Sequence, residues 1–379
     1  MLGEATMIER DLGDPSDYSL QLNRWYLKPI GAWPTLPSTS RLERIVAIVL
    51  ILLCYCSISF TVVPCMLHIL LEDEDIRMKL RAAGPLSHWF AGGINYTTLL
   101  MRSNEIRHCV EHLQTDWRLV TRVKDRQVML KNAKNGRYVA VCCAAFMQAG
   151  VLSYCAVTAW STRIVENGNR TGIVHVLPCA FQTSVVGIFS LAAVFTAHAC
   201  GQLNVLMAWI TELVNESRGR NARIYLNEIG VVVEHHLRVL SFISRIEDVM
   251  TRICFLELVR CSFGICMLGY YILTEWSDHN FQNLTTYFMI MGSMTFNVFI
   301  VCYIGELLTE QCKKVGEVIY MTEWYCLPHK CVLDLTMIIA RSSLLIKITA
   351  AKMIHMSVST FGDVMKTTFA YLNLLHQMV

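Results

Sequence analysis

Five residues near the end of the chain lie on one side of a predicted helix. Asp363, Thr367, Ala370, Leu374 and Gln377 follow one another at intervals of three or four residues. Exposure of this stripe to lipid is unfavourable, because each unpaired polar group in the hydrocarbon core raises the free energy by several kcal/mol. The stripe can instead line a water-filled ion path, with an apolar constriction at Leu374 and uncharged dipoles at Gln377 for a passing cation. A helix packed inside one bundle, with its polar groups hydrogen-bonded there, fits the periodicity equally well.

The rest of the chain predicts a membrane environment for this helix. Of its 379 residues 54% are hydrophobic and only 17% are charged, against about 25% charged in a typical soluble domain. Several runs without Asp, Glu, Lys or Arg approach the roughly 20 residues that a spanning helix needs. We therefore predict an all-α membrane protein with seven transmembrane helices, at about 44–70, 82–101, 138–160, 181–209, 253–275, 284–306 and 354–378.

The basic residues predict the orientation of these spans. With the N-terminus inside, the expected inner segments 1–43, 102–137, 211–252 and 311–353 hold most of the 33 Lys and Arg. Positive residues accumulate on the cytoplasmic side, although long segments follow this rule less strictly. We expect a cytoplasmic N-terminus and an extracellular C-terminus.

Glycosylation sequons agree with this orientation. Asn169 and Asn283 begin N-x-[S/T] sequences in or beside expected outer segments, where glycosylation can occur. Asn95 and Asn215 also begin sequons but fall in a span and an inner segment, so we expect them to stay unmodified. The third span lacks a following Asp-Arg-Tyr and the seventh lacks Asn-Pro-x-x-Tyr, which weighs against a G-protein-coupled receptor.

The inner segments 102–137 and 211–252 have apolar residues at helical spacing, with charges on the other face. Amphipathic helices of this kind need a partner surface. We expect transmembrane helices to extend past the bilayer into a cytoplasmic bundle.

The stretch from Trp324 onward resembles the insect odorant receptor family. The family's inner-loop signature, Trp-Tyr followed by Leu-Pro, is present as Trp324, Tyr325, Leu327 and Pro328. Residues similar to the family's stand further on, at Phe361, Lys366, Tyr371, Leu374 and Leu375. The run Tyr-Leu-Asn-Leu-Leu looks like the ant, bee and wasp branch.

The resemblance implies an odorant-gated, non-selective cation channel. In this family an odorant-tuned subunit assembles with a shared odorant co-receptor as a tetramer, and the last span lines the central pore. Leu374 then matches the gate position and Gln377 the glutamine above it, with Asp363 and Thr367 further inward. This chain resembles the tuned subunit, because it lacks the co-receptor's long insert in the second inner loop. It is expected in the plasma membrane of an olfactory sensory neuron dendrite, in contact with lipid.

The same resemblance divides the chain and predicts an odorant pocket. The divisions are a cytoplasmic segment 1–43, six spans within 44–310, an anchor region 311–353 and a pore-lining helix 354–379. A volatile ligand needs a mostly apolar, aromatic pocket, which the family places in the outer half of the membrane. Plain helix packing is the alternative role for each candidate. The candidates are Trp89, Phe90, Met147, Gly150, Tyr154, Phe189, Met267, Tyr270, Tyr271 and Met289.

Other chemistry has little support. The sequence shows no phosphate-binding loop, nucleophile elbow or kinase signature, so we predict neither an enzyme nor a cofactor or metal. A net charge of +3 predicts no nucleic-acid partner. Glu257 and Arg260, three residues apart, are expected to form a structural ion pair. A gustatory-type receptor channel and a seven-helix metabotropic chemoreceptor remain the alternatives.

Overall fold

Long helices dominate the structure, a computed structural model. It describes residues 15–36, 39–71, 76–160, 163–167, 170–174, 182–216, 222–275, 281–327, 329–344 and 347–378. Each expected span lies mainly within one helix. These helices are α3 (Arg41–Leu71), α4 (Ile76–Met101), α6 (Val123–Trp160), α7 (Gln182–Glu216), α8 (Ala222–Glu275), α9 (Phe281–Met321) and α11 (Val358–Met378).

Shorter elements complete the described chain. They are the helices α2 (Pro15–Leu27), α5 (Ser103–Leu119) and α10 (His329–Ser343), the 3-10 turn Trp324–Cys326, and the strands β1 (Arg163–Asn167), β2 (Arg170–Val174), β3 (Thr349–Ala350) and β4 (Ile354–His355). The strands form two antiparallel hairpins, in which Arg163 pairs with Val174 and Thr349 with His355. Apart from these hairpins the architecture is helical, as the sequence predicts.

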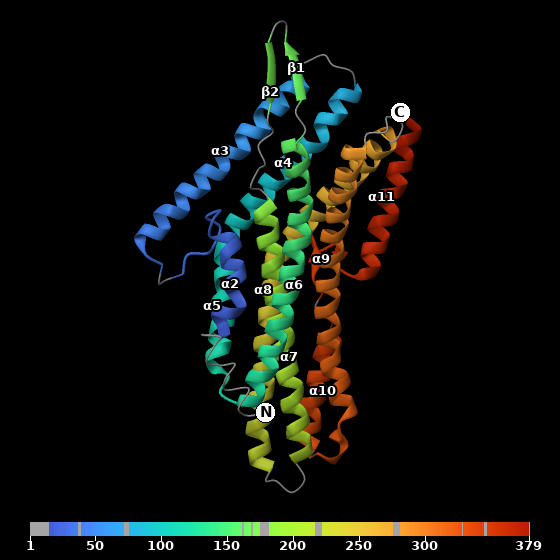
Figure 1. Ribbon diagram of the computed structural model, residues 1–379. Helices are drawn as coiled ribbons and strands as arrows, with labels where there is room; N and C mark the ends of the chain where they lie inside the picture. Colours follow the sequence, from blue (N-terminus) through green and yellow to red (C-terminus); the bar gives the residue numbers. More distant parts are fainter. Residues whose placement is uncertain are drawn as a thin grey trace.

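The long helices α6, α7, α8 and α9 run along most of the molecule, and α7 lies at its centre (Figure 1). The buried side chains of α7 contact α2, α4, α5, α6, α8 and α9. In the view of Figure 1, α3, α4 and α11 lie around the upper half, the β1–β2 hairpin projects above it, and α10 lies beside the lower part of α9. Helix α8 has 54 residues, a length of about 80 Å.

Four described helices are long and apolar enough to cross a membrane: Arg41–Leu71, Ser184–Glu216, Asn227–Leu273 and Leu284–Met321. In the first, only 6% of the most apolar window is buried inside the chain, so its apolar side chains need lipid or another protein as a neighbour.

The last helix begins later than the sequence predicts. Residues 354–355 form β4 and pair with β3 instead of opening the helix. The helix starts after Ser357, whose Oγ accepts the backbone N–H of Thr360 at 3.2 Å. This is an N-cap arrangement, which satisfies one of the free donors at a helix start.

Candidate ligand and pore sites

Helix α11 divides into a packed face and an exposed face. The packed face carries Phe361, Thr368 and Leu372, turned toward the bundle. The Phe361 ring meets Phe299 of α9 edge-on, with ring centroids 5.5 Å apart. Helix α11 packs on α8 and α9 and lies at the side of the molecule (Figure 1).

The exposed face includes the stripe identified from the sequence, together with Lys366, Phe369, Tyr371 and Asn373. Asp363, Thr367, Ala370, Leu374 and Gln377 are all exposed, and the side chain of Leu374 is 54% accessible. The Thr367 hydroxyl donates to the Asp363 carbonyl at 2.8 Å. These exposed side chains are available for contact with water, lipid or another subunit.

The predicted odorant residues fall into three groups. Met147, Phe189, Met267, Tyr270 and Tyr271 are buried, and Trp89 is half-buried. Phe90 and Met289 are 53% and 45% exposed, so within this chain they lie on the outer surface of the bundle. Gly150 and Tyr154 lie in a helix, at positions where the structure does not describe the side chains. The same is true of Asn283, a predicted glycosylation site, and the other such site, Asn169, lies outside the described residues.

At the junction of α4, α8 and α9, one of these residues, Tyr271, meets a tyrosine of α9. The rings of Tyr270 and Tyr271 have centroids 6.0 Å apart, and Tyr271 lies 5.9 Å from Tyr287 of α9. A side chain at Gly84 of α4 would meet the Tyr271 hydroxyl. The sequence analysis did not select Tyr287. Its position at the outer end of the sixth expected span, 284–306, was the available signal.

Two small cavities lie elsewhere in the bundle. One, of about 10 Å³, is enclosed by apolar side chains of α4, α5, α7 and α8, including Leu99, Phe195 and Met250. The other, also about 10 Å³, lies between α2, α6 and α7 near His198. Each has room for about one water molecule, and neither is lined by a predicted odorant residue.

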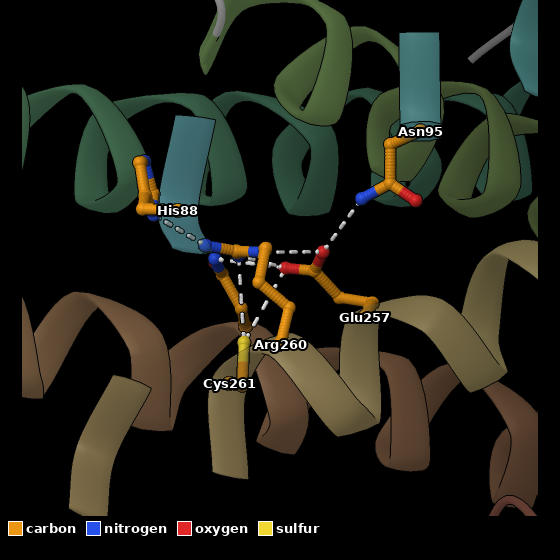
Figure 2. Close-up of polar contacts among 6 residues, drawn as sticks. His88, Asn95, Glu257, Arg260 and Cys261 are labelled. Atoms are coloured by element: carbon orange, nitrogen blue, oxygen red, sulfur yellow. Dashed lines mark hydrogen bonds and ion pairs between the residues drawn. The ribbon is translucent and has the colours of Figure 1, made fainter. Parts of the chain in front are cut away.

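A buried polar cluster lies between α4, α8 and α9, further along these helices from the tyrosines. Glu257 of α8 accepts hydrogen bonds from Arg260 Nε at 2.9 Å, Asn95 Nδ2 of α4 at 3.2 Å and Asn297 Nδ2 of α9 at 3.4 Å. Arg260 Nη1 reaches His88 Nδ1 of α4 at 3.0 Å. Figure 2 shows the Arg260 guanidinium between Glu257 and His88. We call these five residues the Glu257 cluster.

Charges this deeply buried need complete pairing. Glu257 is 2% and Arg260 7% exposed, and both lie within an expected span, where unpaired charge is very costly. The predicted Glu257–Arg260 pair is confirmed. The sequence did not identify Asn95, Asn297 or His88 as its partners, although these polar residues lie inside two of the expected spans, which was a signal.

A second polar cluster joins α5, α7 and α8. The carboxylate of Asp116 lies 3.0 Å from His198 Nε2 and 2.6 Å from Arg238 Nη2. His112 stacks on Phe242, and its Nε2 lies 3.4 Å from the same carboxylate. Burial by itself raises the pKa of Asp116, but the hydrogen bond from His198 and the charges of His112 and Arg238 hold that pKa below its ordinary value. Burial lowers the pKa of His112, and Asp116 offsets that shift only in part.

Known proteins share this fold and part of this sequence. The family model "7tm Odorant receptor" matches residues 171–369. Odorant receptors 13a and 82a of Drosophila melanogaster are each 24% identical, over 48% and 54% of this chain. The matches cover 47% and 51% of those relatives, so the chain spans about half the length of the curated relatives it matches.

The solved structure of the insect olfactory receptor OR5 from Machilis hrabei, in complex with eugenol, is similar in fold. It superposes with a TM-score of 0.76 over 96% of this chain and 98% of that chain, at 14% identity. A second structure of that receptor gives a TM-score of 0.75. Because the family model covers more than half of the sequence, the chain belongs to the insect odorant receptor family, a family of receptors and not of enzymes.

Proposed function

We propose that this chain is the odorant-tuned subunit of a ligand-gated, non-selective cation channel in the plasma membrane. In this proposal seven helices cross the bilayer, with the N-terminus inside and the C-terminus outside. A shared odorant co-receptor completes a tetramer whose central pore is lined by α11. The observation that carries the proposal is the exposure of the polar stripe on α11.

Neither lipid nor the interior of a single bundle is a suitable environment for this stripe. Asp363 and Gln377 at its ends are poor neighbours for lipid, because the bilayer core offers them no hydrogen-bond partners. Packing of the stripe inside one bundle was the alternative, and the exposure of all five residues in the single chain argues against it. A water-filled path shared between subunits satisfies both ends of the stripe, and Leu374 between them supplies an apolar ring that closes by dewetting.

We infer that a volatile, mostly apolar odorant binds near Tyr270, Tyr271 and Tyr287, between α4, α8 and α9. The tyrosine rings supply apolar faces with a few hydroxyls, a composition that suits a small ligand. Met267, one turn inward on α8, adds an adaptable side chain. Glycosylation at Asn169 and Asn283 remains part of the proposal, as does localisation to the sensory dendrite.

Electrophysiology of the chain co-expressed with an odorant co-receptor tests this function. A panel of volatile alcohols, esters and phenols should evoke a cation current that persists when G-protein signalling is blocked. Substitution Leu374→Ala should increase the current without odorant, because a smaller side chain weakens the dewetted constriction. Leu333→Ala is the matched control, since Leu333 is an exposed leucine on α10, away from the stripe. Unchanged gating in Leu374→Ala, or a current that requires G proteins, would refute the pore assignment.

A further inference from the structure

The connection between α10 and α11 contains two consecutive residues in the left-handed region. Ala351 has a φ of 53° and Lys352 a φ of 59°, in the turn that joins β3 to β4. Residues with a Cβ adopt this conformation at a cost in free energy. Such strain persists where the surrounding structure imposes it, and it is often found at positions that move or switch.

Helix α8 imposes this conformation through Thr251. The backbone N–H of Ala351 donates to the carbonyl oxygen of Thr251 at 3.0 Å, and the backbone N–H of Lys352 donates to its hydroxyl at 3.1 Å. One turn earlier on α8, Glu247 accepts the hydroxyl of Thr349 at 2.9 Å. Both strained residues are therefore bonded to one threonine of α8.

Helix α9 holds the other side of the hairpin. A Cβ at Gly305 would lie 2.6 Å from the carbonyl oxygen of Met356, so the backbone just after β4 packs directly on α9. The backbone N–H of Val358, the first residue of α11, donates to Glu306 Oε2 at 2.7 Å. The start of α11 is thus fixed to α8 through the hairpin and to α9 directly.

Helix α8 carries the proposed ligand contacts as well. Thr251, Glu257 and Tyr271 lie on this one continuous helix, with Glu257 less than two turns beyond Thr251. A displacement of α8 at the ligand site therefore reaches the hairpin without crossing a loop.

We propose that Thr251 and the β3–β4 hairpin form a clasp that couples movement of α8 to α11, which makes Thr251 a positioning residue for channel opening. This inference rests on the proposed channel function. The clasp predicts that loss of the Thr251 hydroxyl separates odorant binding from opening, because the Lys352 N–H loses its partner and the left-handed turn relaxes.

The test compares Thr251→Val, which keeps the shape but removes the hydroxyl, with Thr251→Ser, which keeps the hydroxyl. In the purified complex with the co-receptor, amide hydrogen exchange at residues 351–352 should accelerate about tenfold in Thr251→Val and stay near wild type in Thr251→Ser. At equal surface amount, the current evoked by the strongest agonist of the panel should fall about tenfold in Thr251→Val, while the current without odorant is retained. Thr336→Val is the matched control, since the Thr336 hydroxyl donates to the Val332 carbonyl of its own helix, α10.

A second variant covers the case in which Thr251→Val fails to reach the membrane. Thr349→Val removes the bond to Glu247 and the 3.4 Å contact with the Thr251 hydroxyl. It should shift exchange and evoked current in the same direction, by about threefold. Unchanged exchange in both variants would overturn the clasp, and faster exchange with a normal evoked current would overturn the coupling. A wild-type chain that gives no odorant current would instead refute the proposed function, and the Thr251→Val variant plays no part in that result.

Discussion

Replacing Glu257 by alanine is expected to destabilise the protein more than any single surface change. The substitution removes the acceptor shared by Arg260, Asn95 and Asn297. It leaves the Arg260 guanidinium buried, with His88 as its remaining partner on another helix. Breaking a buried pair by deleting one member costs about 3–5 kcal/mol, because the other charge stays in a poorly solvated site.

Thermal melting of the detergent-solubilised complex measures this loss, and we expect a midpoint lower by roughly 5–10 °C. Glu212→Ala is the matched control. Glu212 also forms an ion pair, at 3.1 Å with Arg122, but about half of its side chain is exposed, so its loss should cost no more than about 1 kcal/mol. The double substitution Glu257→Leu with Arg260→Leu should regain most of the lost stability, since apolar side chains of similar size avoid the desolvation cost.

Equal midpoints for Glu257→Ala and Glu212→Ala would refute this reasoning. That result would mean that water or lipid headgroups reach Arg260 and stabilise it without Glu257. A double variant less stable than Glu257→Ala would contradict the second half of the argument, because the cluster would then contribute more than mutual neutralisation.

Three further predictions follow from the described geometry. Gln377→Glu should raise the permeability of Ca²⁺ relative to Na⁺, because a carboxylate ring attracts divalent cations. Reversal potentials measure this permeability ratio. An unchanged ratio would place Gln377 outside the ion path. Because burial depresses the pKa of His112, the unfolded chain binds the proton more tightly, so stability should fall as the pH drops below about 6.5. His112→Gln should flatten that slope in melting curves from pH 7 to 5.5, and parallel curves would exclude His112 as its source. Ala351→Gly should stabilise the complex by about 0.5–1 kcal/mol, since glycine adopts the φ of 53° without strain, whereas Ala350→Gly, in buried β3, should destabilise it.

Periodicity in the sequence was sufficient for features that lie within one helix. Each expected span falls mainly in a helix, because long apolar runs without charges permit few other structures. The stripe from Asp363 to Gln377 remained on one face, since intervals of three and four residues fix its geometry. The Glu257–Arg260 pair was equally accessible, because residues three apart on a helix are neighbours.

Contacts between helices could not be read from the same patterns. Asn95 appeared in the sequence only as a sequon and His88 was not singled out, yet both bind the Glu257–Arg260 pair across the α4–α8 contact. Phe90 and Met289 were chosen as pocket residues but are exposed. In a membrane helix both faces are apolar, so composition does not distinguish the side that meets protein from the side that meets lipid. The β3–β4 turn was also missed, because Ala351 and Lys352 adopt φ values that usually require glycine.

The Glu257 cluster limits how α8 can move when a ligand binds. A ligand shifts a conformational equilibrium only by its difference in affinity between two states, and typical coupling energies are about 1–3 kcal/mol. Sliding α8 past α4 and α9 would break the bonds of Glu257 to Asn95 and Asn297, at a cost of the same size or larger. We therefore expect α4, α8 and the adjoining part of α9 to move together. Because the hairpin before α11 is bonded to α8 at Thr251 and packs on α9 at Gly305, a joint movement of this kind carries the base of α11 with it.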